Sequence, residues 1–232
     1  METSLHRELK RIYAGADARS EVRHGKYRID VVDGDELVEI QHGSLGAIRH
    51  KVRELLQTHA VRVVKPIIAN KLLVKRSRKQ GPIAERRRSP KQGTLLSLFD
   101  ELVYFTKVFP HPRLTLEVAL VDVEEWRYPG RGRRRRYRKN AFVIEDQKLC
   151  QVHSTHRFRT AADLAALLPA RLPAPFHSGQ LSDALGVPRP VAQRIAYCLR
   201  ETGAARLIGK QGNALLYELG AAPAAKRRRK AA

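Results

Sequence analysis

The sequence predicts a mixed α/β (α+β) fold in which a domain built on a β-sheet precedes a smaller helical domain. Over residues 27–41, apolar and polar residues alternate on both sides of a Gly/Asp-rich turn, which is typical of a β-hairpin. Apolar residues at helical spacing come before and after this hairpin. A Pro-rich segment at residues 169–175 then divides the chain. Helices interleaved with strands predict a mixed sheet, and the Pro-rich segment predicts a domain boundary.

The N-terminal elements follow from periodicity and turn chemistry. Leu5, Leu9 and Ile12 share one face of a helix. Ser44 can cap a second helix, and Pro66 is expected to end the strand before it. The expected elements are a helix at residues 4–14, an extended segment at 20–23, hairpin strands at 27–32 and 37–41, a helix after Ser44 and a strand at 61–64. Because a helix connects the hairpin to the last strand, that strand is expected to be parallel to its neighbour.

The middle of the chain combines two basic segments with further regular elements. Glycines and prolines interrupt residues 75–91, which are therefore expected to form a loop. A helix is expected at residues 95–105, and strands are expected at 114–120 and 141–144. Residues 131–139 separate these two strands and are expected to form an exposed loop.

The segment after the Pro-rich linker has the element order of a winged helix-turn-helix. Its expected elements are a short helix at residues 178–187, a longer helix at 188–202 and a hairpin with strands at 205–208 and 215–219. The predicted organisation is therefore a sheet domain at residues 1–160, a winged helix-turn-helix domain at 161–220 and a basic tail at 221–232.

The net charge of +22 is concentrated in three short segments. Residues 75–91 contribute +7, residues 131–139 contribute +7 and residues 226–230 contribute +5, which is 19 of the 22 net charges. A near-neutral body with basic segments excludes a uniformly basic, histone-like coat and favours a polyanionic partner. We expect this partner to be nucleic acid, and DNA in preference to RNA.

Other bulk features concern the cellular location. No apolar run approaches the roughly 18 residues that span a bilayer, and the N-terminus lacks the apolar region of a secretory signal. Cys150 and Cys198 do not form a disulfide framework, which favours a reducing compartment. The Arg- and Ala-rich composition is typical of a GC-rich bacterial genome. We therefore expect no membrane contact and a bacterial cytoplasmic location, at the nucleoid if the chain binds DNA.

Asp30 and Glu39 are the candidate catalytic carboxylates of the hairpin. With a turn at residues 34–35, Asp30 lies directly opposite Glu39, where like charges repel unless a cation lies between them. With a turn at residues 33–34, Arg28 faces Glu39 and a salt bridge needs no metal ion.

Alternation along the strands assigns the neighbouring residues to two faces. Gln41 shares a face with Asp30 and Glu39 in both registers. His42 points to the opposite face and is left outside the expected site. The residues expected to point into a core are Ile29, Val31, Val38 and Ile40. An ordinary solvated hairpin face is the alternative explanation for the polar residues.

The order helix, strand, Asp-bearing strand, Glu-x-Gln strand, helix and strand resembles the core of the PD-(D/E)xK nuclease superfamily. The matching residues are Asp30 and Glu39-Ile40-Gln41, and the resemblance covers about residues 1–70. It implies a restriction-endonuclease-like core with extra strands. It also implies hydrolysis of nucleic-acid phosphodiesters with Mg²⁺ or Mn²⁺, in which Asp30 and Glu39 hold the metal ion, and the metal ion lowers the pKa of a bound water molecule and neutralises charge on the phosphate.

Further positions complete the site that this resemblance implies. Gln41 stands where the superfamily has a Lys that positions or activates water, and Lys51 on the following helix can supply the missing charge. An additional metal ligand comes from an acid near the first helix, for which Glu2, Glu8 and Glu21 are candidates. Residues 2–6, 87–91 and the hairpin also resemble a family of uncharacterised bacterial proteins from planctomycete-type genomes, which implies no particular activity.

The candidate nucleic-acid contacts lie outside the hairpin. On the second helix of the turn motif, Arg189, Gln193 and Arg194 are expected to face outward, where Arg and Gln can read base edges. Lys210 at the tip of the last hairpin can contact phosphate. The candidates in the second basic segment are Arg133, Arg134, Arg135 and Arg136. The alternative function is a non-enzymatic DNA-binding regulator with a degenerate nuclease-like core, in which Gln41 marks the loss of activity.

Overall fold

The chain consists of two compact units. The structure, a computed structural model, describes residues 2–130 and 142–220. The predicted contacts Arg133, Arg134, Arg135 and Arg136 and the basic tail lie outside the described residues. We call residues 1–42, 59–97 and 117–156 the sheet unit, and residues 43–58, 98–116 and 157–232 the helical unit. The helical unit thus holds the predicted C-terminal domain together with two earlier segments of the chain.

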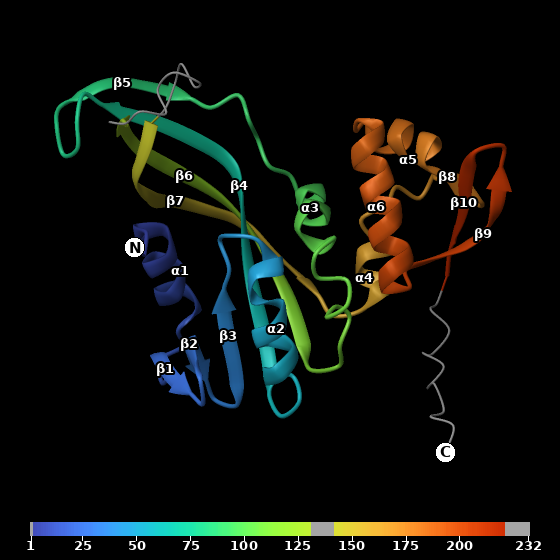
Figure 1. The fold of residues 1–232 in the computed structure, drawn as a ribbon, viewed down its shortest axis with the longest axis horizontal. Coiled ribbons are helices and arrows are strands. Elements are labelled where there is room, and N and C mark those ends of the chain that lie inside the picture. The colour runs from blue at the N-terminus through green and yellow to red at the C-terminus, as the bar shows by residue number, and fades with distance from the viewer. Residues whose placement is uncertain (1, 131–141, 221–232) are drawn as a thin grey trace. The chain divides into compact units, whose positions relative to one another are not determined.

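The sheet unit is built on a mixed sheet, in which the described residues form seven strands (Figure 1). The strands are β1 Arg19–His24, β2 Tyr27–Asp33, β3 Glu36–Ile40, β4 Ala60–Arg76, β5 Ile83–Arg88, β6 Leu114–Pro129 and β7 Phe142–Phe158. Their order is β1-β2-β3-β4-β6-β7, and β5 pairs with β4. Strand β3 is antiparallel to β2 and parallel to β4. The predicted mixed sheet and the predicted parallel strand are therefore confirmed.

The turn between β2 and β3 adopts one of the two expected registers. The paired residues are Val31↔Val38, Val32↔Leu37 and Asp33↔Glu36. Gly34 has a φ of 56°, a left-handed conformation that glycine adopts without steric cost. The turn therefore lies at residues 34–35, and the adopted register is the one in which Asp30 falls opposite Glu39.

Two predictions for the middle of the chain are wrong. Strand β4 continues through Pro66, where the sequence predicts its end. The ladder between β3 and β4 ends at Ile40↔Val64, so Pro66 lies beyond it and removes no amide from that ladder. Residues 83–88 form strand β5 where a loop is expected, because the extended β4 offers an edge with which β5 pairs.

Three other elements differ from expectation in length. The helix expected at residues 95–105 is a 3₁₀ turn at Leu95–Ser97 followed by the short α3, Leu98–Leu102. Strands β6 and β7 are longer than the expected 114–120 and 141–144. Along β6, buried and partly exposed residues continue to alternate well past residue 120, so the pleated pattern extends the strand.

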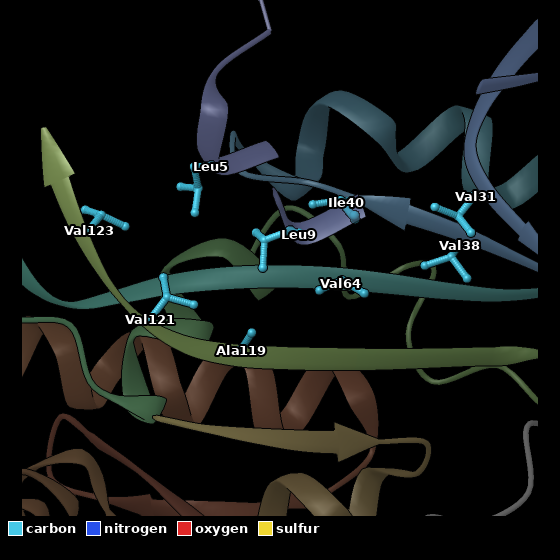
Figure 2. Close-up of a cluster of buried hydrophobic side chains, with 9 residues drawn as sticks. All are labelled: Leu5, Leu9, Val31, Val38, Ile40, Val64, Ala119, Val121 and Val123. Carbon is cyan, nitrogen blue, oxygen red and sulfur yellow. The ribbon is translucent and has the colours of Figure 1, made fainter. Parts of the chain in front are cut away.

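One face of helix α1 (Ser4–Tyr13) packs against the sheet (Figure 2). Leu5 and Leu9 are fully buried, as the spacing predicts, whereas Ile12 is 55% exposed. The cluster that they form with the sheet consists of Leu5, Leu9, Val31, Val38, Ile40, Val64, Ala119, Val121 and Val123. Thr3 caps the helix by accepting a hydrogen bond from the His6 amide at 3.4 Å. This packing fixes which residues of α1 face the strands.

The helical unit contains a second, smaller sheet. Its elements are α2 Leu45–Leu55, α3, α4 Ala161–Ala165, β8 Phe176–His177, α5 Ser178–Leu185, α6 Arg189–Thr202, β9 Ala205–Gln211 and β10 Ala214–Leu219. The strand order is β8-β10-β9, with both pairs antiparallel. Ser44 caps α2 as predicted, and Gly186 and Gly203 end α5 and α6 in left-handed conformations. Among residues 2–130 and 142–220, no helix has the length and apolar character needed to cross a bilayer.

We predict that Leu9→Ala lowers the free energy of unfolding by about 2–5 kcal/mol, because it leaves a cavity between α1 and the sheet. The matched control is Ile12→Ala on the same helix, whose side chain is 55% exposed and whose removal is expected to cost about 0.5 kcal/mol or less. Urea unfolding measures both variants. Equal losses would show that α1 is not anchored by its Leu5–Leu9 face.

Candidate functional site

Asp30 lies where strands β2 and β3 separate. The last recorded pair is Val31↔Val38, and the Ile40 amide beyond it donates a hydrogen bond to Asp30 Oδ2 at 2.8 Å. The other carboxylate oxygen, Oδ1, lies 3.1 Å from His6 Nε2 on α1. The Asp30 side chain thus accepts the amide that a regular ladder would pair with a backbone carbonyl, and it turns toward α1.

The opposite edge of β2 is also irregular at this point. The pairs Ser20↔Val31 and Val22↔Ile29 flank Glu21, which has a φ of 59°. A non-glycine residue in the left-handed region costs energy and requires compensation from its surroundings. The distortion lies beside Asp30, so both edges of β2 depart from regular pairing at the candidate carboxylate.

Three carboxylates converge on the ammonium group of Lys10. Lys10 Nζ lies 2.7 Å from Glu2 Oε1 and 3.6 Å from Asp30 Oδ1, and it also contacts Glu21. Lys10 is only 8% exposed, which is unusual for lysine unless its charge is compensated. Arg28 forms a second ion pair with Glu21. The cluster therefore holds a buried cation of α1 among oxygen donors from the segment before α1, from β1 and from β2.

These residues line one pocket of the sheet unit, with a volume of about 770 Å³. We call it the α1–β2 pocket. The residues of its wall used below are Glu2, His6, Lys10, Glu21, Asp30 and His42. His6 and Lys10 lie four residues apart on α1, beside the buried Leu5–Leu9 face, and Glu2 lies just before the helix cap Thr3.

The charges of the pocket alter the titration of its side chains. Burial alone would raise the pKa of Asp30, but hydrogen bonds from His6 and the Ile40 amide and the charge of Lys10 bring it below its ordinary value. The hydrogen bond from Lys10 likewise lowers the pKa of Glu2. Asp30 and Glu2 are therefore ionised at neutral pH and available as anionic oxygen donors.

His42 belongs to the pocket wall, contrary to expectation. Burial lowers the pKa of His42, and the positive charge of Lys65 lowers it further, so its imidazole is neutral at neutral pH. The Lys65 ammonium donates a hydrogen bond to the His42 carbonyl at 3.0 Å. Strict alternation places Asp30 and His42 on opposite faces, but the separation of β2 and β3 turns the Asp30 carboxylate to the side on which His42 lies.

The other predicted catalytic residues lie elsewhere. Glu39 is 5% exposed and Gln41 is half-buried, and neither is among the residues that line the α1–β2 pocket. Lys51 is on α2 in the helical unit and is not among them either. Glu8, one of the three candidate acids, accepts the Leu149 amide at 2.7 Å. The structure thus brings together Asp30, Glu2 and Glu21 and leaves out Glu8.

A basic residue that the sequence reasoning did not single out shares a sheet face with Glu39. Strands β3 and β4 are parallel with Glu39 paired to Val63, so Lys65 follows two residues later on the same face by alternation. Lys65 is only 4% exposed. The strand next to the Glu-x-Gln segment therefore carries a buried basic side chain. From the sequence, the additional positive charge is expected on the following helix, at Lys51.

The residues of the helical unit that are predicted to contact nucleic acid differ in exposure and in ion pairing. Arg189 and Gln193 of α6 are exposed, as is Lys210 near the end of β9. Arg194 is partly exposed and forms an ion pair with Asp100. The outward position predicted for Arg189 and Gln193 therefore agrees with their exposure.

The donor chemistry of the pocket suits a divalent cation, whereas its present arrangement suits an ammonium. Carboxylate oxygens are the protein ligands that Mg²⁺ and Mn²⁺ prefer, and Glu2, Glu21 and Asp30 surround one cationic position. That position is held by Lys10. In the described ranges, no group of three or more His, Cys, Asp and Glu side chains is arranged to bind a metal ion. A metal ion at these oxygens therefore requires the Lys10 side chain to move.

We predict that Asp30→Asn lowers the free energy of unfolding at neutral pH, and that the difference from wild type shrinks in acid. A carboxyl group whose pKa is lowered in the folded state stabilises the fold above its unfolded pKa of about 3.9, and this contribution is lost as the pH falls through the folded pKa. Urea unfolding at neutral and acidic pH measures the effect. Asp35→Asn, in the exposed turn, is the control. A difference that is independent of pH would contradict the charge-based explanation.

Comparison with known proteins places the chain in a family. Residues 3–159 match a family described as "Domain of unknown function (DUF8091)". A protein of Treponema pallidum (strain Nichols), described as "Uncharacterized protein", is 33% identical over 218 residues, which cover 93% of this chain and 84% of the relative. No solved structure matches the chain. The family match covers the α1–β2 pocket apart from Glu2 and ends close to the predicted domain boundary, and the chain belongs to the DUF8091 family.

Proposed function

We propose that the chain is a metal-dependent hydrolase of nucleic-acid phosphodiesters, and of DNA in the first place. The observation that carries this proposal is the convergence of Glu2, Glu21 and Asp30 on one buried cation beside the separated strands β2 and β3. Strained backbone and irregular pairing are found preferentially at functional sites, which supports a catalytic reading of Asp30 and Glu21.

The carboxylates of Glu2, Glu21 and Asp30 would hold Mg²⁺ or Mn²⁺, which when bound lowers the pKa of a water molecule and offsets charge on the phosphate. His6 and the Ile40 amide fix the Asp30 carboxylate at 3.1 and 2.8 Å, so this donor is oriented before an ion arrives. With a metal ion at these oxygens, the Lys10 ammonium would leave the carboxylates and would be available in the pocket to bind a phosphate oxygen. Neutral His42 can accept a proton in the pocket wall.

Residues 161–220 are proposed to form a winged helix that binds DNA. The order α4, β8, α5, α6, β9, β10, with the strands in one antiparallel sheet, supports this assignment. Arg189 and Gln193 are exposed on α6, the helix that would enter the major groove. The net charge of +22 supports nucleic acid as the partner of both units.

The second candidate function is a DNA-binding regulator without hydrolase activity. The observation that favours it is that the Lys10 ammonium already pairs with the carboxylates of Glu2, Glu21 and Asp30. Glu39 does not line the pocket, and Gln41 stands where the resemblance leads one to expect a Lys. In this function Lys10 is a permanent structural cation and the α1–β2 pocket carries no chemistry.

We predict that the purified chain cleaves duplex DNA when Mg²⁺ or Mn²⁺ is added, and that Asp30→Asn lowers the rate by about 100-fold, because a ligand carboxylate is lost. Gel analysis of labelled DNA and RNA with and without chelator measures the reaction. Asp35→Asn, which removes the same charge from the exposed turn of the same hairpin, is expected to retain the wild-type rate.

The comparison between these two variants separates the candidate functions. Cleavage that persists equally in Asp30→Asn would identify a contaminating nuclease and contradict hydrolysis at the pocket. No metal-dependent cleavage by the wild type, together with footprinting of a defined duplex, would favour the regulator. Faster cleavage of RNA than of DNA would contradict the substrate preference proposed here.

We predict that Arg189→Ala combined with Gln193→Ala weakens binding to a duplex selected from a random-sequence pool by about 10-fold or more, since each good base contact contributes about 1–3 kcal/mol. The control is Arg206→Ala on β9, whose guanidinium pairs with Glu218 Oε2 at 2.8 Å. Fluorescence anisotropy measures the affinities. Equal losses in the two proteins would contradict a reading role for α6.

A further inference from the structure

Strand β5, which pairs with β4 (Figure 1), carries three arginines among its six residues. All six of its residues, Ile83–Arg88, are exposed, and they pair antiparallel with the last part of β4. An exposed edge strand presents unpaired backbone groups and is usually short or charged. The identity and position of the charges on β5 therefore indicate which kind of partner this edge can bind.

The register of β5 separates its charged residues into two faces. Residues paired across an antiparallel ladder share a face, and alternate residues along a strand share a face. The pairs Val74↔Arg86 and Leu72↔Arg88 place both arginines on one face. The pairs Lys75↔Glu85 and Leu73↔Arg87 place Lys75, Glu85 and Arg87 on the other.

Only one of these faces compensates its own charge. Glu85 Oε2 lies 3.6 Å from Lys75 Nζ, and Glu85 Oε1 lies 3.2 Å from Arg87 Nε. Within residues 2–130 and 142–220, neither Arg86 nor Arg88 has an ion-pair partner. The Arg86–Arg88 face thus presents two guanidinium groups whose charge is not offset.

Arg88 also borders a polar hollow of about 380 Å³. Asn70, Ser89 and Gln92 line the same hollow and carry hydrogen-bond donors. Its acidic residue, Asp122, is engaged by the Asn70 amide and by His153 Nε2, both at 2.8 Å. A phosphate group at Arg88 would therefore find further donors beside it and a carboxylate already occupied by other partners.

We propose that the Arg86–Arg88 face of β5 binds the sugar–phosphate backbone of the duplex DNA on which the proposed hydrolase acts. This inference rests on the proposed function for the identity of the substrate. Residues two apart on a strand are about 6.8 Å apart, close to the separation of successive phosphates along a nucleic-acid strand. Guanidinium groups bind phosphate oxygens in pairs, so each arginine can hold one phosphate.

Protection of the sheet edge against self-association does not account for this pattern. Charge of either sign keeps two edges apart, so protection requires neither arginine in particular nor a face free of acids. Phosphate binding requires positive charge without a competing carboxylate, which is the difference between the two faces of β5.

The test compares two variants that remove the same charge. Arg86→Gln/Arg88→Gln removes two positive charges from the face of β5 that carries no acid. Lys75→Gln/Arg87→Gln removes two positive charges from the face that carries Glu85. Binding of labelled duplex DNA is measured by anisotropy over a salt series in chelator, where no metal-dependent cleavage occurs. The slope of log K against log salt is expected to fall by about 1.8 in the first variant, from about 0.9 per phosphate contact. It is expected to fall by less than half as much in the second.

Each result decides the inference. Equal slope changes, or none in either variant, would overturn it, because long-range charge or other residues would then account for binding. Arg86→Glu/Arg88→Glu keeps the edge charged, so weaker DNA binding with unchanged solubility supports phosphate contact and undiminished binding overturns it. A slope difference found on single-stranded RNA but absent on duplex DNA would overturn the assignment of the partner.

These measurements are independent of the proposed catalytic step. Loss of cleavage with an intact slope difference between the two variants would contradict the hydrolase and leave the DNA-binding face in place. Cleavage that depends on Asp30 with no slope difference would contradict the face alone.

Discussion

The packing of one face of α1 against the sheet is the constraint on which the candidate site depends. Leu5 and Leu9 are buried in the cluster of β2, β3, β4 and β6 side chains, which fixes the rotation of the helix about its axis. His6 and Lys10 are adjacent to this face and are therefore directed at the pocket, whereas Glu2 lies in the segment before the helix cap Thr3. Apolar burial, which has no chemical specificity of its own, thus determines where two of the polar groups lie.

The separation of β2 from β3 places the Asp30 carboxylate next to His6 and Lys10. A regular ladder would pair the Ile40 amide with a backbone carbonyl of β2, but here the Asp30 side chain receives this amide, and Glu21 on the neighbouring strand adopts a left-handed φ of 59°. The energetic cost of Glu21 is offset by its ion pairs with Lys10 and Arg28. The irregular backbone and the charge cluster therefore stabilise each other.

Local pattern predicts the parts of this architecture that depend on neighbours in sequence. The alternating pattern and Gly34 predict the hairpin, and the observed register is one of the two that they permit. Helical spacing predicts the buried face of α1. The length of β4 and the existence of β5 depend instead on pairing between distant segments, so prolines and glycines at residues 66–93 are misleading there. For the site, the hairpin pattern predicts Asp30, whereas the sequence offers Glu2, Glu8 and Glu21 as candidates and does not separate them. Lys10 and His6 could have been found from their spacing of four after Glu2, but His42 could not, because its place depends on the distortion at Asp30.

Both candidate functions use the same arrangement of carboxylates around Lys10, and they differ in the cation that these carboxylates bind. Three carboxylates this close repel one another and need a cation, and in the absence of a metal ion the ammonium supplies it. A divalent ion would compete for the same oxygens, and Lys10, on a flexible four-carbon stem, can withdraw without disturbing the Leu5–Leu9 face. A hydrolase and a regulator built on this core differ in which cation the carboxylates prefer, a property of Glu2, Glu21, Asp30 and Lys10 and not of the fold.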